Sequence, residues 1–97
     1  MKISKFQDLM RKLYFEKDHK RGIKNTYIWL VEEIGELANL LKQKEMDTEK
    51  ISEELADIIA WTNSLANLLN IDLEEALFQK YPNKCKKCDS NPCKCKK

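Results

Sequence analysis

Apolar side chains recur along most of the chain at spacings of three and four residues, which is the period of an amphipathic α-helix. The pattern predicts four helices, over residues 4–17, 25–44, 48–69 and 72–81. Connections of only a few residues make consecutive helices antiparallel neighbours. We therefore expect an all-α, four-helix bundle.

Capping and breaking residues set the expected ends of these helices. Ser4 followed by Gln7 is a capping-box pattern and predicts the first helix start. Residues 17–22 are charged, lack apolar periodicity and end in a glycine, so they predict a loop. Asp47 or Thr48 is the expected cap of the third helix. Asp72 is the expected cap of the last helix, which Pro82 terminates.

Each of the two long predicted helices has a largely apolar stripe, which we expect to face the core. The stripe consists of Tyr27, Leu30, Val31, Ile34, Leu37, Ala38 and Leu41 in the second helix, and of Ile51, Leu55, Ile58, Ile59, Thr62, Leu65, Ala66 and Leu69 in the third.

Beside this stripe, each long helix carries two acids three residues apart. Glu33 and Glu36 form the pair on the second helix, and Glu54 and Asp57 form the pair on the third. Residues three apart project from neighbouring turns on one side of a helix. Each pair is flanked by a tryptophan and a leucine, namely Trp29 with Leu40 and Trp61 with Leu68.

If the two pairs face each other, four carboxylates meet around one point. Four such charges do not stay ionised together unaided, so either some are protonated or a divalent cation binds among them. Oxygen ligands without His or Cys suit Mg²⁺ or Mn²⁺. The alternative is that the acids are ordinary solvated surface charge, as most such pairs are.

The acids also lie in two short motifs. Residues 32–36 (EEIGE) and 54–57 (ELAD) resemble the EExxE and ExxD motifs of the MazG-like, all-α nucleoside triphosphate pyrophosphohydrolases. The likeness extends over residues 3–82, including residues 71–76 and the closing Lys-Tyr-Pro at 80–82.

The resemblance implies Mg²⁺-dependent hydrolysis of a nucleoside triphosphate, a dNTP or a non-standard NTP, to the monophosphate and pyrophosphate, which clears nucleotides from the pool. It implies that Glu33, Glu36, Glu54 and Asp57 hold the metal. Glu32, the first acid of the motif, is a candidate base or a supporting residue, and Glu33 belongs to the same catalytic pair. Family members form dimers or tetramers, so we expect a homo-oligomer here.

Five side chains are candidates for binding the substrate. Lys80 matches the family, and Lys24 directly precedes the second predicted helix, which carries the EExxE-like motif. Both are candidate phosphate ligands, although ordinary solvated lysines are the simpler interpretation. Trp29 and Trp61 can stack on a base, or can belong to the core. Asn63, two residues after Trp61, is a candidate for hydrogen bonding to base or sugar.

The charge of the chain is unevenly distributed. Residues 82–97 contain six Lys and one Asp, a net charge of +5, which leaves −3 for residues 1–81 of the total of +2. No apolar run approaches the roughly 18 residues of a membrane span, and the N-terminus lacks a secretory signal pattern. We expect a cytoplasmic protein, with no membrane partner.

The basic tail, residues 83–97, is expected to be separate from the helical domain of residues 1–82. It contains four cysteines in a C-x2-C-x4-C-x-C pattern: Cys85, Cys88, Cys93 and Cys95. Four thiolates suit one structural Zn²⁺, and the alternatives are two disulfides or free thiols. The resemblance to the family says nothing of this tail, which can brace subunits, cover the site or bind an anion.

Two other functions fit the pattern. One is phosphoribosyl-ATP pyrophosphohydrolase, a biosynthetic enzyme of the same superfamily. The other is a non-catalytic helical oligomer with a nucleic-acid-binding zinc tail, although we do not expect a nucleic-acid partner. A ferritin-like di-iron site is excluded because the only histidine, His19, is not part of an ExxH pair.

Overall fold

The computed structural model describes residues 1–96; Lys97, the last lysine of the tail, lies outside the described residues. Four helices form: α1 (Ile3–Arg21), α2 (Ile23–Leu41), α3 (Thr48–Leu68) and α4 (Leu73–Lys80). No strand occurs in residues 1–96, which confirms the all-α prediction. None of the helices in this part of the chain is long and apolar enough to cross a membrane.

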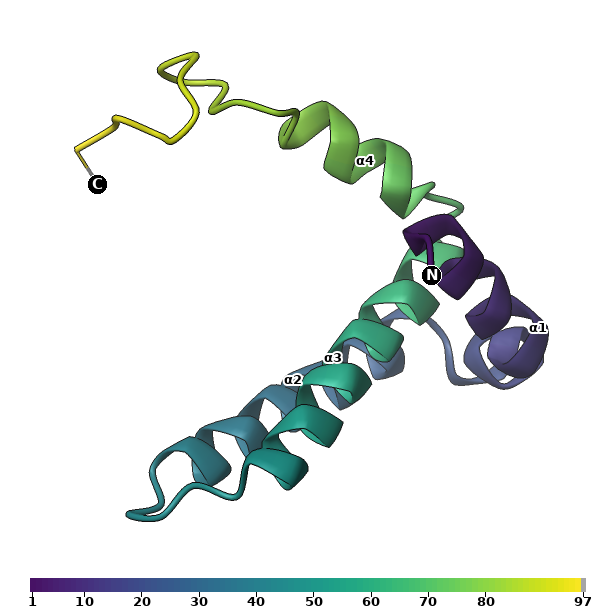
Figure 1. Ribbon diagram of the computed structural model, residues 1–97. Helices are drawn as coiled ribbons and strands as arrows, with labels where there is room; N and C mark the ends of the chain where they lie inside the picture. Colours follow the sequence, from purple (N-terminus) through teal and green to yellow (C-terminus); the bar gives the residue numbers. More distant parts are fainter. Residues whose placement is uncertain (97) are drawn as a thin grey trace.

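The helices form an open arrangement rather than a closed bundle (Figure 1). α2 and α3 run side by side as a long hairpin, and α1 packs near the carboxyl end of α3. α4 contacts α1 and leads away from the hairpin, carrying the C-terminal tail with it. The radius of gyration is 16.0 Å, whereas a compact domain of this length has about 13 Å.

The loop predicted over residues 17–22 is wrong, because α1 continues through it to Arg21. Asp18 is buried there, and its carboxylate accepts a 2.6 Å hydrogen bond from Arg21. Gly22 alone separates the two helices, with φ 86° and ψ 166°. Only glycine adopts this region of φ and ψ readily, so the chain turns at that residue.

The predicted cap at Ser4 is also wrong. Lys2 occupies the N-cap position of α1 without a side-chain bond, and the Ser4 backbone N–H donates to Glu74. Gln7 instead joins three elements: its Nε2 donates to Asn67 Oδ1 and the Ile71 carbonyl, at 3.0 and 2.7 Å, and its Oε1 accepts from the Leu73 N–H. This amide fixes α1 against the connection between α3 and α4.

Other predicted helix ends agree more closely with the structure. Asp47 caps α3 by accepting from the Lys50 N–H, and Asp72 caps α4 by accepting from the Glu75 N–H. α4 ends at Lys80, two residues before the proline. α2 begins at Ile23 and ends at Leu41, three residues earlier than predicted.

The predicted core stripe is buried only in part: Ala66 is buried, and Leu37 and Ile58 are half-buried. Ile34 on α2 and Ile59 on α3, near the centre of the stripe, are 48% and 56% exposed. Tyr27, Val31, Leu41, Leu55 and Leu69 of the same stripe are also exposed. The flank that carries the partly buried Glu33 and Glu54 also lies in the hairpin contact, so the exposed part of the apolar stripe is left without a covering helix.

Candidate functional site

A cluster of carboxylates lies between the two hairpin helices. Glu33 and Glu36 project from neighbouring turns of α2, and Glu54 projects from α3. One oxygen of each carboxylate lies within 4.8 Å of the other two. Glu33 and Glu54 are partly buried, whereas Glu36 is exposed, so the cluster has an open side.

Two of the predicted site acids lie outside this group of three. Asp57 is one turn further along α3 and is exposed; its charge acts on Glu54, and its side chain lines a neighbouring cavity. Glu32 precedes the cluster on α2 and is exposed. The structure thus brings three acids together directly and leaves the other two at the edge.

The electrostatics of the cluster are dominated by like charges. A hydrogen bond with the Glu33 carboxyl, burial, and the charges of Glu33 and Asp57 raise the pKa of Glu54 to about 7, while Glu36 opposes the shift. Glu54 Oε1 is buried, and no group among the described residues hydrogen-bonds to it. Crowded carboxylates with an unpaired oxygen fit a hard divalent cation such as Mg²⁺.

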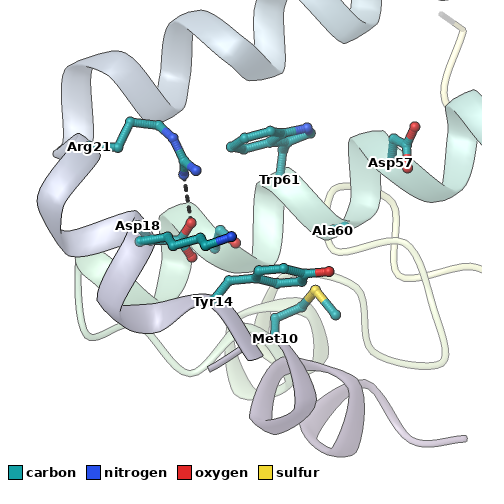
Figure 2. A pocket seen from close by; sticks show the side chains of 9 residues that line it. Met10, Tyr14, Asp18, Arg21, Asp57, Ala60 and Trp61 are labelled. Carbon is teal, nitrogen blue, oxygen red and sulfur yellow. Dashed lines mark hydrogen bonds and ion pairs between the residues drawn. The ribbon is translucent and has the colours of Figure 1, made fainter. Parts of the chain in front are cut away.

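A cavity of about 330 Å³ adjoins the cluster through Asp57. It lies between α1 and α3, as Figure 2 shows. It is lined by Met10, Tyr14, Lys17, Asp18, Arg21, Asp57, Ala60, Trp61 and Ser64. Its size and its mixture of aromatic and charged walls are typical of a small-molecule pocket.

Aromatic stacking organises one wall of this cavity. The Arg21 guanidinium lies 4.7 Å from the centre of the Trp61 ring, and also bonds to Asp18 (Figure 2). Trp29 of α2 stacks on Trp61, with the ring centres 6.2 Å apart and an interplanar angle of 10°. The second oxygen of Asp18 is buried and has no hydrogen-bond partner within residues 1–96.

The remaining substrate-binding candidates lie elsewhere. Asn63 is buried, donates to the Ile59 carbonyl at 2.8 Å and does not line the cavity. Lys24 is exposed in the first turn of α2. Lys80 is exposed at the end of α4 and lines a groove of the tail rather than the carboxylate cluster.

Sequence reasoning missed the part of the cavity that α1 contributes. Tyr14, Asp18 and Arg21 line it, but two of them fall in the stretch that was predicted to be a loop. Their spacings of four and three residues continue the helical period from Met10. That spacing was the available signal, and the high charge of the stretch concealed it.

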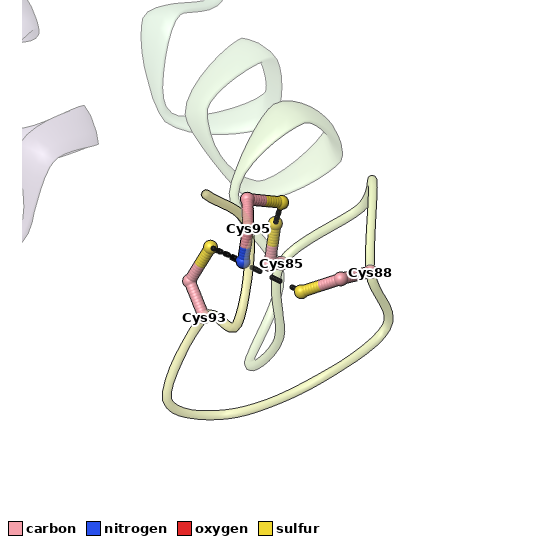
Figure 3. Close-up of side chains that lie close together, drawn as sticks. All are labelled: Cys85, Cys88, Cys93 and Cys95. Carbon is pink, nitrogen blue, oxygen red and sulfur yellow. Dashed lines mark hydrogen bonds between the residues drawn. The ribbon is translucent and has the colours of Figure 1, made fainter. Parts of the chain in front are cut away.

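A second cluster lies in the tail, where four cysteine side chains converge (Figure 3). All four Sγ atoms lie within 4.8 Å of one another, and the thiols are free. Hydrogen bonds from backbone N–H groups, of which the Lys94 N–H has the largest effect, lower the pKa of Cys88 to about 6. Hydrogen bonds with the neighbouring thiols, of which Cys93 has the largest effect, raise the pKa of Cys95 to about 11. Without a cation, Cys88 therefore ionises more readily than Cys95.

Comparison with known proteins adds one finding. A family model described as the MazG nucleotide pyrophosphohydrolase domain matches residues 21–89, which include all five motif acids. A search of curated proteins found no match for this chain.

Proposed function

Since the chain belongs to the MazG nucleotide pyrophosphohydrolase family, we propose that it hydrolyses a nucleoside triphosphate between the α and β phosphates. The products are the nucleoside monophosphate and pyrophosphate. The observation that carries the proposal is the carboxylate cluster of α2 and α3, which coincides with the family motif.

In this proposal, Glu33, Glu36 and Glu54 hold Mg²⁺, or Mn²⁺, and Asp57 approaches from the next turn. The buried, unpaired oxygen of Glu54 supports this ligand set. When bound, such a cation supplies Lewis acidity toward the phosphates and the attacking water. The cysteines offer different ligand chemistry, and the Zn²⁺ that we expect there has no part in this reaction.

The residues of the chain then have distinct roles. Glu32 is exposed beside the cluster and is the candidate acceptor for a proton of the attacking water. The cavity between α1 and α3 receives the nucleoside, with Tyr14 and Trp61 as apolar walls. The free oxygen of Asp18 can accept a hydrogen bond from an exocyclic amino group of a base.

We assign the substrate class as dNTPs or non-standard NTPs, and the cellular role as nucleotide clearance in the cytoplasm. If the base has no amino group, the buried Asp18 oxygen stays unpaired, which costs free energy. The site therefore favours bases with an exocyclic amino group, namely cytosine, adenine or guanine, over uracil. Lys24 and Lys80 are candidate phosphate ligands; a contact from Lys80 requires another subunit, because α4 leads away from the hairpin (Figure 1).

The proposal includes a homodimer or homotetramer. The exposed stripe around Ile34 and Ile59 is an apolar surface that a second copy of the same stripe can cover. The expanded radius of gyration supports this, because an open chain buries less apolar surface within itself than a compact one.

The test is pyrophosphate release by the purified protein from a panel of nucleotides with Mg²⁺. We expect turnover of at least one dNTP or non-standard NTP, and none of phosphoribosyl-ATP. Glu36→Ala and Asp57→Ala should each lose at least about 100-fold in kcat/KM, because loss of even an outer partner of a metal ligand costs about 10–100-fold. Glu16→Ala, which removes an exposed acid of α1, is the matched control and should retain activity.

Circular dichroism should show that the variants keep their helices. Turnover of phosphoribosyl-ATP alone would reassign the substrate, and activity toward none of the panel would contradict catalysis. Full activity of both Glu36→Ala and Asp57→Ala would show that these carboxylates are not part of the active site.

A further inference from the structure

The four tail sulfurs have the spacing of a tetrahedral metal site. Zn–S bonds of about 2.3 Å place the sulfurs of a tetrahedron about 3.8 Å apart. Cys85 Sγ lies 3.8 Å from Cys95 Sγ, and Cys88 Sγ lies 3.9 Å from Cys93 Sγ. Disulfide sulfurs are about 2.05 Å apart, so these pairs are not arranged as disulfides.

The backbone around the sulfurs is folded to support them. The Lys94 N–H donates to Cys88 Sγ at 3.2 Å, and the Cys95 N–H donates to Cys93 Sγ at 3.3 Å. A tight turn closes the first half, because the Asp89 N–H donates to the Cys85 carbonyl at 2.7 Å. Asp89 has φ 61°, a left-handed conformation that Asp tolerates in turns. Such N–H···S bonds orient and stabilise thiolate ligands.

The halves of the tail are also joined to each other. The Cys85 N–H donates to the Ser90 carbonyl at 2.9 Å, and Asn91 Nδ2 donates to the Asn83 carbonyl at 2.7 Å. Lys84 pairs with Asp89 at 2.7 Å. Polar contacts at the surface stabilise weakly, so they do not account for an ordered tail by themselves.

The composition of the tail supplies no other source of order. Residues 83–96 contain Lys, Cys, Asn, Asp, Ser and one Pro, and no Leu, Ile, Val, Met or aromatic residue. A segment without large apolar side chains cannot fold by burying them. In small domains of this kind, the free energy of metal binding provides the free energy of folding.

We propose that the four cysteines of the tail bind one Zn²⁺ as a four-thiolate site, and that this ion folds residues 83–96. Zinc with four thiolates carries a net charge of −2, and the lysines of the tail offset it. The site goes beyond the proposed pyrophosphohydrolase function, because its ligands are thiolates and the tail lies away from the α2–α3 hairpin that carries the carboxylates (Figure 1).

The first measurement is the metal content of the full chain, purified with a thiol reductant and without chelator. We expect one Zn per chain by elemental analysis, and loss of that Zn in Cys88→Ser and Cys93→Ser. Ser90→Ala, which changes the tail without removing a sulfur, and Glu54→Gln, which changes the carboxylate cluster, should both retain it. Replacement by Co²⁺ should give the visible absorption of a tetrahedral thiolate complex.

The second measurement tests folding of the tail by trypsin, for which its lysines are natural cleavage sites. Removal of zinc by a chelator should speed cleavage within residues 84–94 at least about 10-fold, while the helices stay resistant. Adding back Zn²⁺ should restore protection in the parent chain and not in Cys88→Ser.

Three results would overturn the proposal. They are fewer than 0.1 Zn per chain with all four thiols reduced, two disulfides in the metal-free protein by mass, or iron in place of zinc. Each outcome is independent of nucleotide turnover, so failure of the zinc site and failure of the proposed function are distinguishable.

Discussion

At the scale of single residues, the pKa of the Glu54 carboxyl lies well above its ordinary value. This carboxyl shares a hydrogen bond with Glu33, is partly buried and lies near other acids, which together raise its pKa to about 7. A carboxyl with a pKa above that of the unfolded chain binds more protons in the folded state. Folding of the metal-free protein should therefore become less favourable as the pH rises from about 4.5 to about 7.

We predict a pH-dependent effect of Mg²⁺ that follows from this carboxyl. Below pH 7 a cation must displace the Glu54 proton, so apparent Mg²⁺ affinity should fall as the pH is lowered from 8 to 6. Calorimetry in buffers of different ionisation enthalpy should detect proton release on binding at pH 6. Glu54→Gln should abolish the release. Equal proton release from Glu54→Gln would show that another group carries the proton.

At the scale of elements, the junction of α1 and α2 depends on one glycine. Gly22 has φ 86°, whereas Gly35, in the interior of α2, has a helical backbone and nothing within 4 Å of an added Cβ. The two glycines of the chain therefore respond to the same substitution in opposite ways. The difference matters for the cavity, because Asp18 and Arg21 are placed by the last turn before Gly22.

Gly22→Ala should lower the free energy of unfolding by about 1–3 kcal/mol, because a Cβ strains this backbone conformation. Gly35→Ala should raise it by about 0.5–1 kcal/mol, because alanine restricts the unfolded chain and favours the helix. Chemical denaturation of both variants under the same conditions provides the comparison. Equal effects of the same sign would contradict the assigned junction.

At the scale of the whole molecule, the chain is open, and part of the apolar stripe on its hairpin faces outward. Ile34 and Ile59 on neighbouring helices of the hairpin are each about half exposed. Apolar stripes of this regularity are normally buried, because exposing them costs free energy in proportion to their area. In the proposed oligomer, a second copy of the chain covers this exposed stripe.

We predict that Ile34→Lys and Ile59→Lys weaken self-association at least about 30-fold, the effect of a strong interface residue. Met46→Lys, an equally large change at an exposed apolar residue in the loop between α2 and α3, should leave association unchanged. Sedimentation over a range of concentrations measures the dissociation constants. A monomeric parent chain would contradict the oligomer.

The features that can be predicted from the sequence alone are chiefly local. The helical period predicts four helices, and Asp47 and Asp72 cap α3 and α4. The spacing of Glu33 and Glu36 places both on one side of α2. The four cysteines lie within a few residues of one another, so their convergence also needs little long-range information. Such features depend on bonds within one or two turns of the chain.

Which helix faces meet depends on long-range packing and cannot be predicted from the local pattern. The sequence indicates an apolar stripe but not whether it packs within the chain or against another copy, since burial gives the same pattern in both cases. The extension of α1 to Arg21 depends on Asp18 and on the Trp61 ring, which is 40 residues away in sequence. The cavity and the position of Asp57 at its edge follow from the same non-local packing, which no local pattern encodes.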